Sequence, residues 1–208
     1  MIELITANIV ILANHLPSIL TPTWVKDKKI IEEEAKQFVT TSTFSLFESE
    51  HYVFTADPVR LQLSTKLPND EKSLKHIPEA LEKYVDNFKG LTFKALGLNF
   101  ILMHRTGQNK QYNISTQIQY SENSVELKRI FDDHTTKLGS ILYVENPPYR
   151  LRLVIEPTDE SSFKYDFNYH YDIPNSDTQL IKEYLNAFAE RYENSKLLIR
   201  KIVGDKDE

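Results

Sequence analysis

The sequence predicts an α+β fold with a mainly antiparallel sheet, two β-x-βββ-α halves, helices packed on one face and a long C-terminal helix. Three observations favour it. Short segments rich in Val, Thr, Phe and Tyr recur between Pro, Gly and Asn turn signals. Segments with apolar residues at helical spacing follow two groups of these strands. The order of elements occurs twice along the 208 residues. We expect residues 1–208 to form one domain with a frayed tail at 204–208. It is built either from two halves at 1–90 and 91–203 or from a single α+β sheet without internal symmetry.

The first half is expected to begin with a buried strand at residues 4–13, where apolar side chains alternate. A connector at 14–36 follows, in which 32–36 is predicted to form a helical turn. Three antiparallel strands are then predicted at 38–48, 51–56 and 59–66. The half closes with an amphipathic helix that carries apolar residues from Ile77 to Phe88, with Pro78 in its first turn and Gly90 just past its end.

The second half is expected to repeat this order. A central strand at 91–104 is followed by a strand at 113–120 and a helix at 124–135, which Asn123 and Glu126 begin in capping-box spacing. Three strands are predicted at 140–145, 149–156 and 162–171. The closing helix at 177–202 begins with Ser176 and Gln179, also in capping-box spacing. It is long enough to cross a whole sheet.

An aromatic ring occupies every second position of one predicted strand. Because side chains of a strand alternate between its two faces, these rings share a single face. The closing helix has an apolar stripe of matching length, so we expect it to fold back and bury the rings. The alternative is an exposed row that stacks the bases of single-stranded nucleic acid. The rings belong to Phe163, Tyr165, Phe167, Tyr169 and Tyr171.

The opposite, polar face of this strand is predicted to pair with basic residues of the preceding strand. Matching the apolar faces of the two strands places Arg152 opposite Asp166 and Arg150 opposite Asn168. The Arg152–Asp166 pair is most simply a solubility feature. Arg150 and Arg152 could also contact an anionic partner, and they are candidate partner-binding residues.

The connector between the first two strands contains an unusually apolar segment at residues 16–25, stiffened by two prolines. It holds Ile19, Leu20 and Trp24, the only tryptophan of the chain. Such a segment must dock against apolar surface. It either packs on its own sheet or supplies a Trp anchor to another protein, and we take these three residues as candidate partner-binding residues.

The sequence contains no signature of catalysis. Zero cysteines exclude disulfides and thiolate chemistry, and the five glycines form no phosphate-binding loop. The six histidines are dispersed, and the acid-histidine cluster at residues 132–134 does not converge on one ion. We therefore predict no catalytic, cofactor-binding or metal-binding residue. A net charge of −5 makes nucleic acid an unlikely partner, and without a long apolar segment we expect a cytoplasmic protein that does not bind membranes.

Two sets of segments carry resemblances to known proteins. Residues 53–65 (VFTADPVRLQLST), the helix that ends at Phe88 and residues 95–101 (ALGLNFI) resemble an uncharacterised bacterial family built from two sheet-plus-helix halves. The first strand, the Pro-rich connector with Trp24 and the next three strands also resemble the export chaperone SecB. That second resemblance implies an oligomer that binds unfolded clients. Neither resemblance supplies catalytic residues.

The favoured hypothesis from the sequence is a non-enzymatic protein that acts through protein-protein contacts, as a homo-oligomer or as an assembly subunit of a bacterial complex. One alternative is a SecB-like chaperone that holds unfolded clients. The other is an enzyme whose site is assembled between the two halves, which a cleft with converging acids or histidines would favour.

Overall fold

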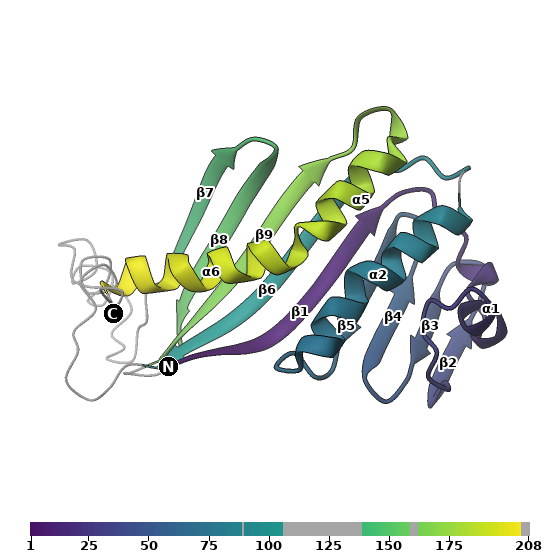
Figure 1. The fold of residues 1–208 in the computed structure, drawn as a ribbon, viewed down its shortest axis with the longest axis horizontal. Coiled ribbons are helices and arrows are strands. Elements are labelled where there is room, and N and C mark those ends of the chain that lie inside the picture. The colour runs from purple at the N-terminus through teal and green to yellow at the C-terminus, as the bar shows by residue number, and fades with distance from the viewer. Residues whose placement is uncertain (89, 106–138, 159–161, 205–208) are drawn as a thin grey trace, which may run out of the picture.

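The computed structural model of the protein describes residues 1–88, 90–105, 139–158 and 162–204. The described strands form one nine-stranded sheet with the order β2-β3-β4-β5-β1-β6-β9-β8-β7, and every neighbouring pair is antiparallel. The helices cover one face of this sheet (Figure 1). The α+β fold predicted from the sequence is therefore confirmed.

The strands are β1 (Ile2–Leu12), β2 (Gln37–Thr40), β3 (Ser45–Glu48), β4 (Tyr52–Ala56), β5 (Arg60–Thr65), β6 (Ala95–Arg105), β7 (Ser140–Asn146), β8 (Tyr149–Pro157) and β9 (Ser162–Asp172). The helices are α1 (Pro22–Asp27), α2 (Glu71–Asn87), α5 (Thr178–Asn186) and α6 (Phe188–Val203), with short 3-10 turns η1 (Pro17–Ile19) and η2 (Pro174–Ser176). The strand predicted at 113–120, the helix predicted at 124–135, the acid-histidine cluster at 132–134 and the tail at 205–208 lie outside the described residues.

The two halves share one strand arrangement. In the first half, β1 pairs with β5, and β4 and β3 follow outward. In the second half, β6 pairs with β9, and β8 and β7 follow outward. The halves join through β1 and β6, which are antiparallel, so a pseudo-two-fold axis at the Asn8–Asn99 pair relates one half to the other. Under this relation β7 corresponds to β3, and β2 is an additional strand beyond β3.

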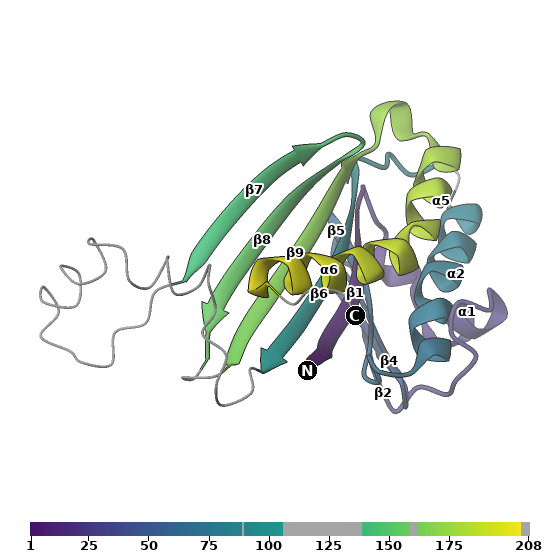
Figure 2. The ribbon, with the colours of Figure 1, turned by 60° about the vertical axis from the view of Figure 1, so that its left-hand side comes forward.

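The aromatic row on β9 lies in the core. All five rings are at most 4% exposed, which confirms the prediction that a helix covers them and leaves them inaccessible for base stacking. Helices α5 and α6 form the cover, and Figure 2 shows α6 crossing the sheet over this half. Phe188 packs on Phe100 with ring centroids 4.8 Å apart, and Tyr184 packs on Tyr171 at 4.3 Å. Arg191 donates from Nε to the Tyr171 hydroxyl at 2.8 Å.

The first half buries its own aromatic cluster under α2. Tyr84 of α2 is fully buried and contacts Phe54, Phe88 and Trp24. Its hydroxyl is 2.8 Å from Nδ1 of the buried His15, whose Nε2 lies 3.0 Å from the Ile11 carbonyl oxygen. The helices that cover the two halves are linked at the surface, where Lys182 of α5 forms an ion pair with Asp86 of α2 at 2.6 Å.

The connector and the strand after it differ from their prediction. Residues 32–36 form no helical turn, and the short helix of the connector is α1, which Thr21 caps by accepting a hydrogen bond from the Trp24 amide. The predicted strand at 38–48 is two strands, β2 and β3, joined by a turn. The turn forms because the Thr41 hydroxyl accepts hydrogen bonds from the amides of Thr43 and Phe44, which ends strand pairing there.

Both long helices also begin or continue differently from their prediction. Helix α2 begins at Glu71, since the Asp70 carboxylate caps the Ser73 amide at 2.8 Å, and Pro78 therefore lies inside the helix. The closing helix is interrupted at Ala187, where α5 ends and α6 begins. Asp177, in place of Ser176, supplies its cap and accepts from the amides of Gln179 and Leu180.

Candidate interaction surface

The face of the sheet opposite the helices is polar along its centre. Asn8, Asn99 and Asn168 form a cross-strand row on β1, β6 and β9. Asn168 donates to the Asn99 side chain, and Asn99 donates to Oδ1 of Asn8 at 2.8 Å. The Asn8–Asn99 pair of this row lies on the pseudo-two-fold axis, so its amide hydrogen bond connects the two halves across the open face.

A shallow hollow of about 450 Å³ lies beside this amide row. Gly97 forms part of its floor, and a Cβ placed there would make only ordinary contacts of 3.6–3.8 Å. Its titratable lining groups are Arg60, Asp166 and His170. Asp166 and His170 are four residues apart on β9, about 13 Å along a strand, so they do not form an acid-base pair. The hollow joins the two halves but holds no converging acids or histidines.

Arg150 and Arg152 lie on this open face, but in a different register from the prediction. Arg152 is opposite Asn168 and Arg150 is opposite His170, while Asp166 faces Val154. The predicted Arg152–Asp166 pair is therefore wrong by two residues. Arg150 instead contacts both carboxylate oxygens of Asp172 at 3.0 Å, and His170 Nε2 lies 3.0 Å from the same carboxylate.

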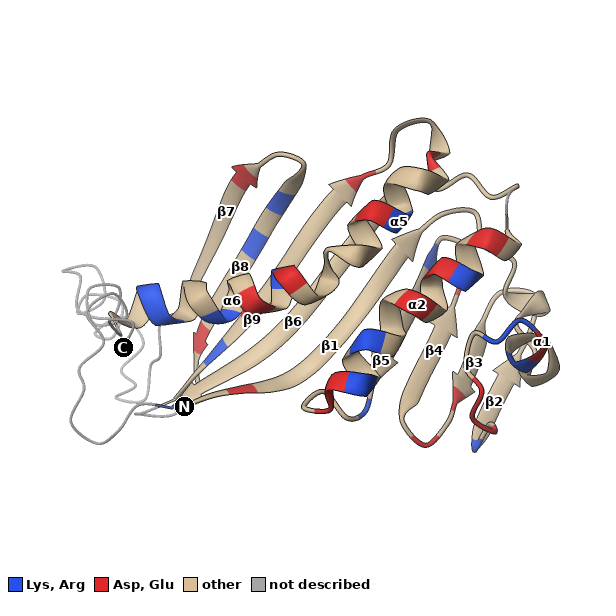
Figure 3. Ribbon diagram, in the orientation of Figure 1, with Lys and Arg blue, Asp and Glu red and all other residues tan. Residues whose placement is uncertain are grey.

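Strand β7 is the edge of the described sheet next to these arginines, and it exposes apolar side chains on both faces. Tyr143 is 74% exposed, Ile141 53%, Val144 45% and Leu142 41%. Tyr143 lies opposite Arg152, so an exposed tyrosine and a basic side chain adjoin. Figure 3 shows β7 almost free of charge, with one acidic residue near its end, beside the basic residues of β8. That acid is Glu145.

No protein-family model matches this chain, and no curated protein sequence matches it.

Sequence reasoning did not single out β7. The sequence feature that distinguishes β7 is the uninterrupted apolar run Ile141-Leu142-Tyr143-Val144. A strand with one solvent-exposed face alternates apolar and polar residues instead. Such an uninterrupted run is typical of a strand that is buried on both faces. In the structure, however, these four side chains are exposed.

The connector residues take three different positions. Leu20 is 2% exposed and belongs to the core. Trp24 is half-buried and packs on Phe88, the residue just after α2, with ring centroids 5.1 Å apart. Ile19 is 37% exposed. The segment thus docks largely against its own chain, which is the structural one of the two alternatives, and of these three residues Ile19 alone presents an exposed side chain.

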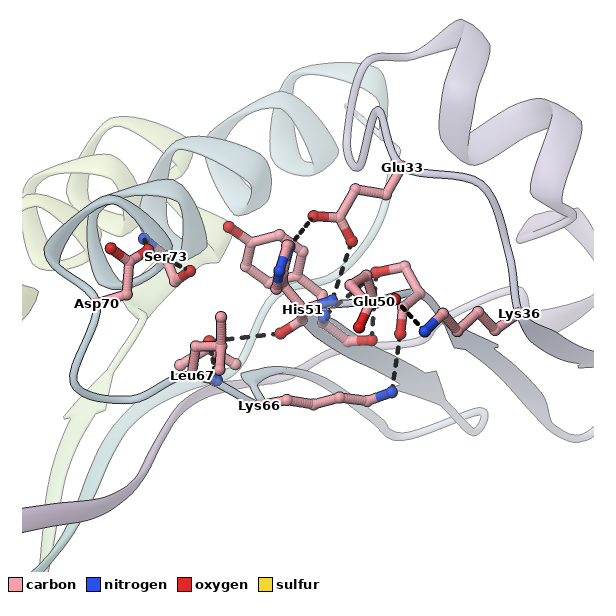
Figure 4. Close-up of polar contacts among 11 residues, drawn as sticks. Glu33, Lys36, Glu50, His51, Lys66, Leu67, Asp70 and Ser73 are labelled. Atoms are coloured by element: carbon pink, nitrogen blue, oxygen red, sulfur yellow. Dashed lines mark hydrogen bonds and ion pairs between the residues drawn. The ribbon is translucent and has the colours of Figure 1, made fainter.

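The densest group of charged side chains ties the connector to the β3–β4 turn (Figure 4). Glu33 accepts from the His51 amide at 3.0 Å and its Oε1 is 2.6 Å from His51 Nδ1. Lys66 contacts Glu48 at 2.6 Å and donates to the Ser49 carbonyl at 2.8 Å. Burial alone would raise the pKa of Glu33, but hydrogen bonds from Ser49 and His51 outweigh it and hold that pKa below its ordinary value.

This charged group is a structural clamp. A Glu-His pair can orient a general base, and covalent catalysis with such a pair also needs a nucleophile within hydrogen-bond reach of the base. The Ser49 hydroxyl in this group belongs to a fully buried residue and hydrogen-bonds to the Glu33 carboxylate, so it is not open to a substrate. Among the described residues, no three His, Asp or Glu side chains form a group that could hold a metal ion. In the same residues, no helix has the length and apolar character required to span a bilayer.

Proposed function

We propose that this chain is a non-enzymatic assembly protein that binds other protein chains through the exposed edge of β7. The observation that carries the proposal is the run of four exposed apolar side chains on β7, from Ile141 to Val144. An edge strand offers unpaired backbone amides and carbonyls, and a partner strand can add to it by β-augmentation.

The chemistry next to β7 supports this proposal. Tyrosine and arginine are enriched where interfaces concentrate their binding energy, and Tyr143 adjoins Arg152 on the open face. Arg152 is exposed, so it can pair with a partner carboxylate. Arg150 is already held by Asp172 and would contribute mainly to the shape of this surface.

The two alternative functions draw less support from the described residues. A site between the halves would have to use the hollow above Gly97, whose acid and histidine lie far apart. A client-holding chaperone needs a broad apolar surface for unfolded segments. The exposed apolar residues of β7 instead form a strand edge one element wide.

A site-specific photo-crosslink tests the proposal. The crosslinking amino acid p-benzoylphenylalanine replaces Tyr143 in the cells that make the protein, and the matched control replaces Phe44, an aromatic residue 42% exposed in the β2–β3 turn. We expect a discrete adduct of defined mass from position 143 and none from position 44. No adduct at 143, or the same adducts from both positions, would contradict binding through β7.

A further inference from the structure

The structure assigns a specific occupant to the β7 edge: we infer that it pairs antiparallel with β7 of a second copy of this chain, centred on Tyr143. This inference rests on the proposed function and names its partner. It joins two sheets of nine described strands across a two-fold axis, which is a closed, isologous interface.

The internal repeat shows what this edge accepts. Strand β7 corresponds to β3, and in the first half the outer side of β3 is occupied by β2, an antiparallel strand. The pseudo-two-fold relation that exchanges Asn8 and Asn99 also exchanges Glu48 with Tyr143. Gln37 pairs with Glu48, so the strand that fills the equivalent place beside β7 puts a residue directly opposite Tyr143. Among the described strands none occupies that place.

Strand β7 is suited to self-pairing by its sequence. Pairing Tyr143 with Tyr143 of the second copy is the register in which all seven residues of the strand find a partner, from Ser140 to Asn146. Leu142 then lies opposite Val144 of the second copy, and Val144 opposite its Leu142. These two residues are on the helix-facing side, where Leu142 neighbours Leu153 and Val144 neighbours Leu151, both at most 5% exposed. Self-pairing therefore extends the apolar core face of one sheet into the next.

The charges permit this register. The one acid of β7, Glu145, would lie opposite Ile141 of the second copy, and Arg150 is its neighbour within its own sheet. The two Glu145 residues would be four positions apart along the seam, about 13 Å, so no like charges face each other. On the open face, four side chains would lie in a row across the seam: Arg152 and Tyr143 of one copy, then Tyr143 and Arg152 of the other. Each tyrosine would thus lie between the arginine of its own copy and the tyrosine ring of the second copy.

Strand β7 also lacks the features that prevent an edge strand from pairing with another chain. It has no Pro or Lys, and it is seven residues long, whereas β2 at the other edge of the described sheet is four residues long. A seam of one strand from each copy is small beside the roughly 1,200–2,000 Å² of a stable interface, so we expect a dissociation constant of about 1–100 µM.

Sedimentation velocity of the full chain from 1 to 500 µM tests the association. We expect a concentration-dependent shift from 24.3 kDa to twice that mass. Tyr143→Lys places two lysines at the axis and should raise the dissociation constant at least tenfold, without unfolding a side chain that is 74% exposed. The matched control is Phe38→Lys, at an exposed aromatic residue of the other edge strand, and it should leave the dimer intact.

A disulfide trap tests the register, because the chain contains no cysteine of its own. Under oxidation, Tyr143→Cys should give a covalent dimer, since directly opposed residues have Cα atoms about 4.5–5.5 Å apart. Glu145→Cys, on the same face of the same strand, should not, because its counterpart lies about 13 Å away.

The possible results separate the inference from the proposed function. A position-143 crosslink to a different protein, with the purified chain monomeric, would preserve β7 as a binding edge and overturn self-pairing. A monomer with no crosslink and with β7 amides protected from hydrogen exchange would show the edge covered from within the same chain, and would overturn both. Open filaments, or a dimer lost in Phe38→Lys but kept in Tyr143→Lys, would also overturn self-pairing.

Discussion

The buried pair of hydroxyls between β9 and α6 gives a testable prediction about stability. We expect Tyr169→Phe to destabilise the wild-type protein but to be neutral or stabilising in the Ser195→Ala variant. The Ser195 hydroxyl donates to the Arg191 carbonyl at 2.8 Å, so it accepts from the Tyr169 hydroxyl, 2.9 Å away. Tyr169 and Ser195 are both fully buried, and burial raises the pKa of Tyr169 to about 12 although the hydrogen bond to Ser195 lowers it. Tyr169 therefore depends on Ser195, whereas Ser195 retains a second partner.

The magnitudes follow from this asymmetry. Tyr169→Phe removes one hydrogen bond and leaves Ser195 satisfied, at a cost of about 0.5–1.5 kcal/mol. Ser195→Ala leaves a buried donor without an acceptor, at about 1–3 kcal/mol, offset by about 0.5 kcal/mol because alanine favours helix. Adding Tyr169→Phe to Ser195→Ala removes the stranded hydroxyl, so there it should be neutral or stabilising by up to about 1 kcal/mol.

Urea unfolding followed by far-ultraviolet circular dichroism measures the four free energies of this cycle, provided that the m-value is unchanged. The control is Tyr165→Phe, on the same strand and face, which should cost the same with and without Ser195. The reasoning is refuted if Tyr169→Phe destabilises both backgrounds equally, within about 0.5 kcal/mol. That result would mean that the hydroxyl pair does not hold α6 on the aromatic row.

Three further predictions concern the core, acid stability and the connector. Phe188→Ala should lower the unfolding free energy by about 3–5 kcal/mol, while Leu197→Ala, 41% exposed on the same helix, should change it by about 0.5 kcal/mol or less. Burial lowers the pKa of His15 and His76 below 6.5, so below that pH the unfolded state binds more protons than the folded state. The free energy of unfolding should therefore be flat above pH 6.5 and fall below it, by up to about 1.4 kcal/mol per pH unit for each histidine. His76→Gln should reduce this slope in urea titrations between pH 5.5 and 7.5. Glu33→Gln should lower the free energy of unfolding by about 1–2 kcal/mol, a value that allows for solvent screening because Glu33 is 29% exposed. Limited proteolysis should then cleave the connector faster than in wild type. Because the pKa of Glu33 is lowered in the folded state, wild type should lose the same contribution to stability as the pH falls through that pKa.

The sequence predicted the layers of the fold because they depend on local periodicity. Five rings at alternate positions of β9 can lie on one face only, and the apolar stripe of the closing helix gives that face its cover. The register between β8 and β9 was predicted wrongly by two residues for the same reason. A slip of one residue would turn every side chain to the other face, but a slip of two preserves the faces, so periodicity does not detect it.

Competing local signals explain the remaining differences. Pro78 suggested a helix start, but Asp70 with Ser73 forms a stronger start seven residues earlier, and the helix continues through the proline. From its sequence the apolar connector was expected either to dock on its own sheet, the favoured alternative, or to bind a partner. In the structure Trp24 contacts Tyr84 of α2 and Phe88 just after it. These rings are more than fifty residues away in the chain, so no local sequence pattern predicts the contact.

Strand order decides which apolar strand is exposed, and order arises from long-range pairing. Strand β6 carries apolar residues on both faces, interrupted by Asn99 on the open face, and lies between β1 and β9. Strand β7 carries a comparable apolar run but is the last of the described strands, with β8 as its one neighbour among them. Nothing in the seven residues of β7 states this position. An apolar run is neutral toward burial by its own chain or by another chain. In the function that we propose, the same hydrophobic free energy that buries β6 within the chain binds a second protein at β7.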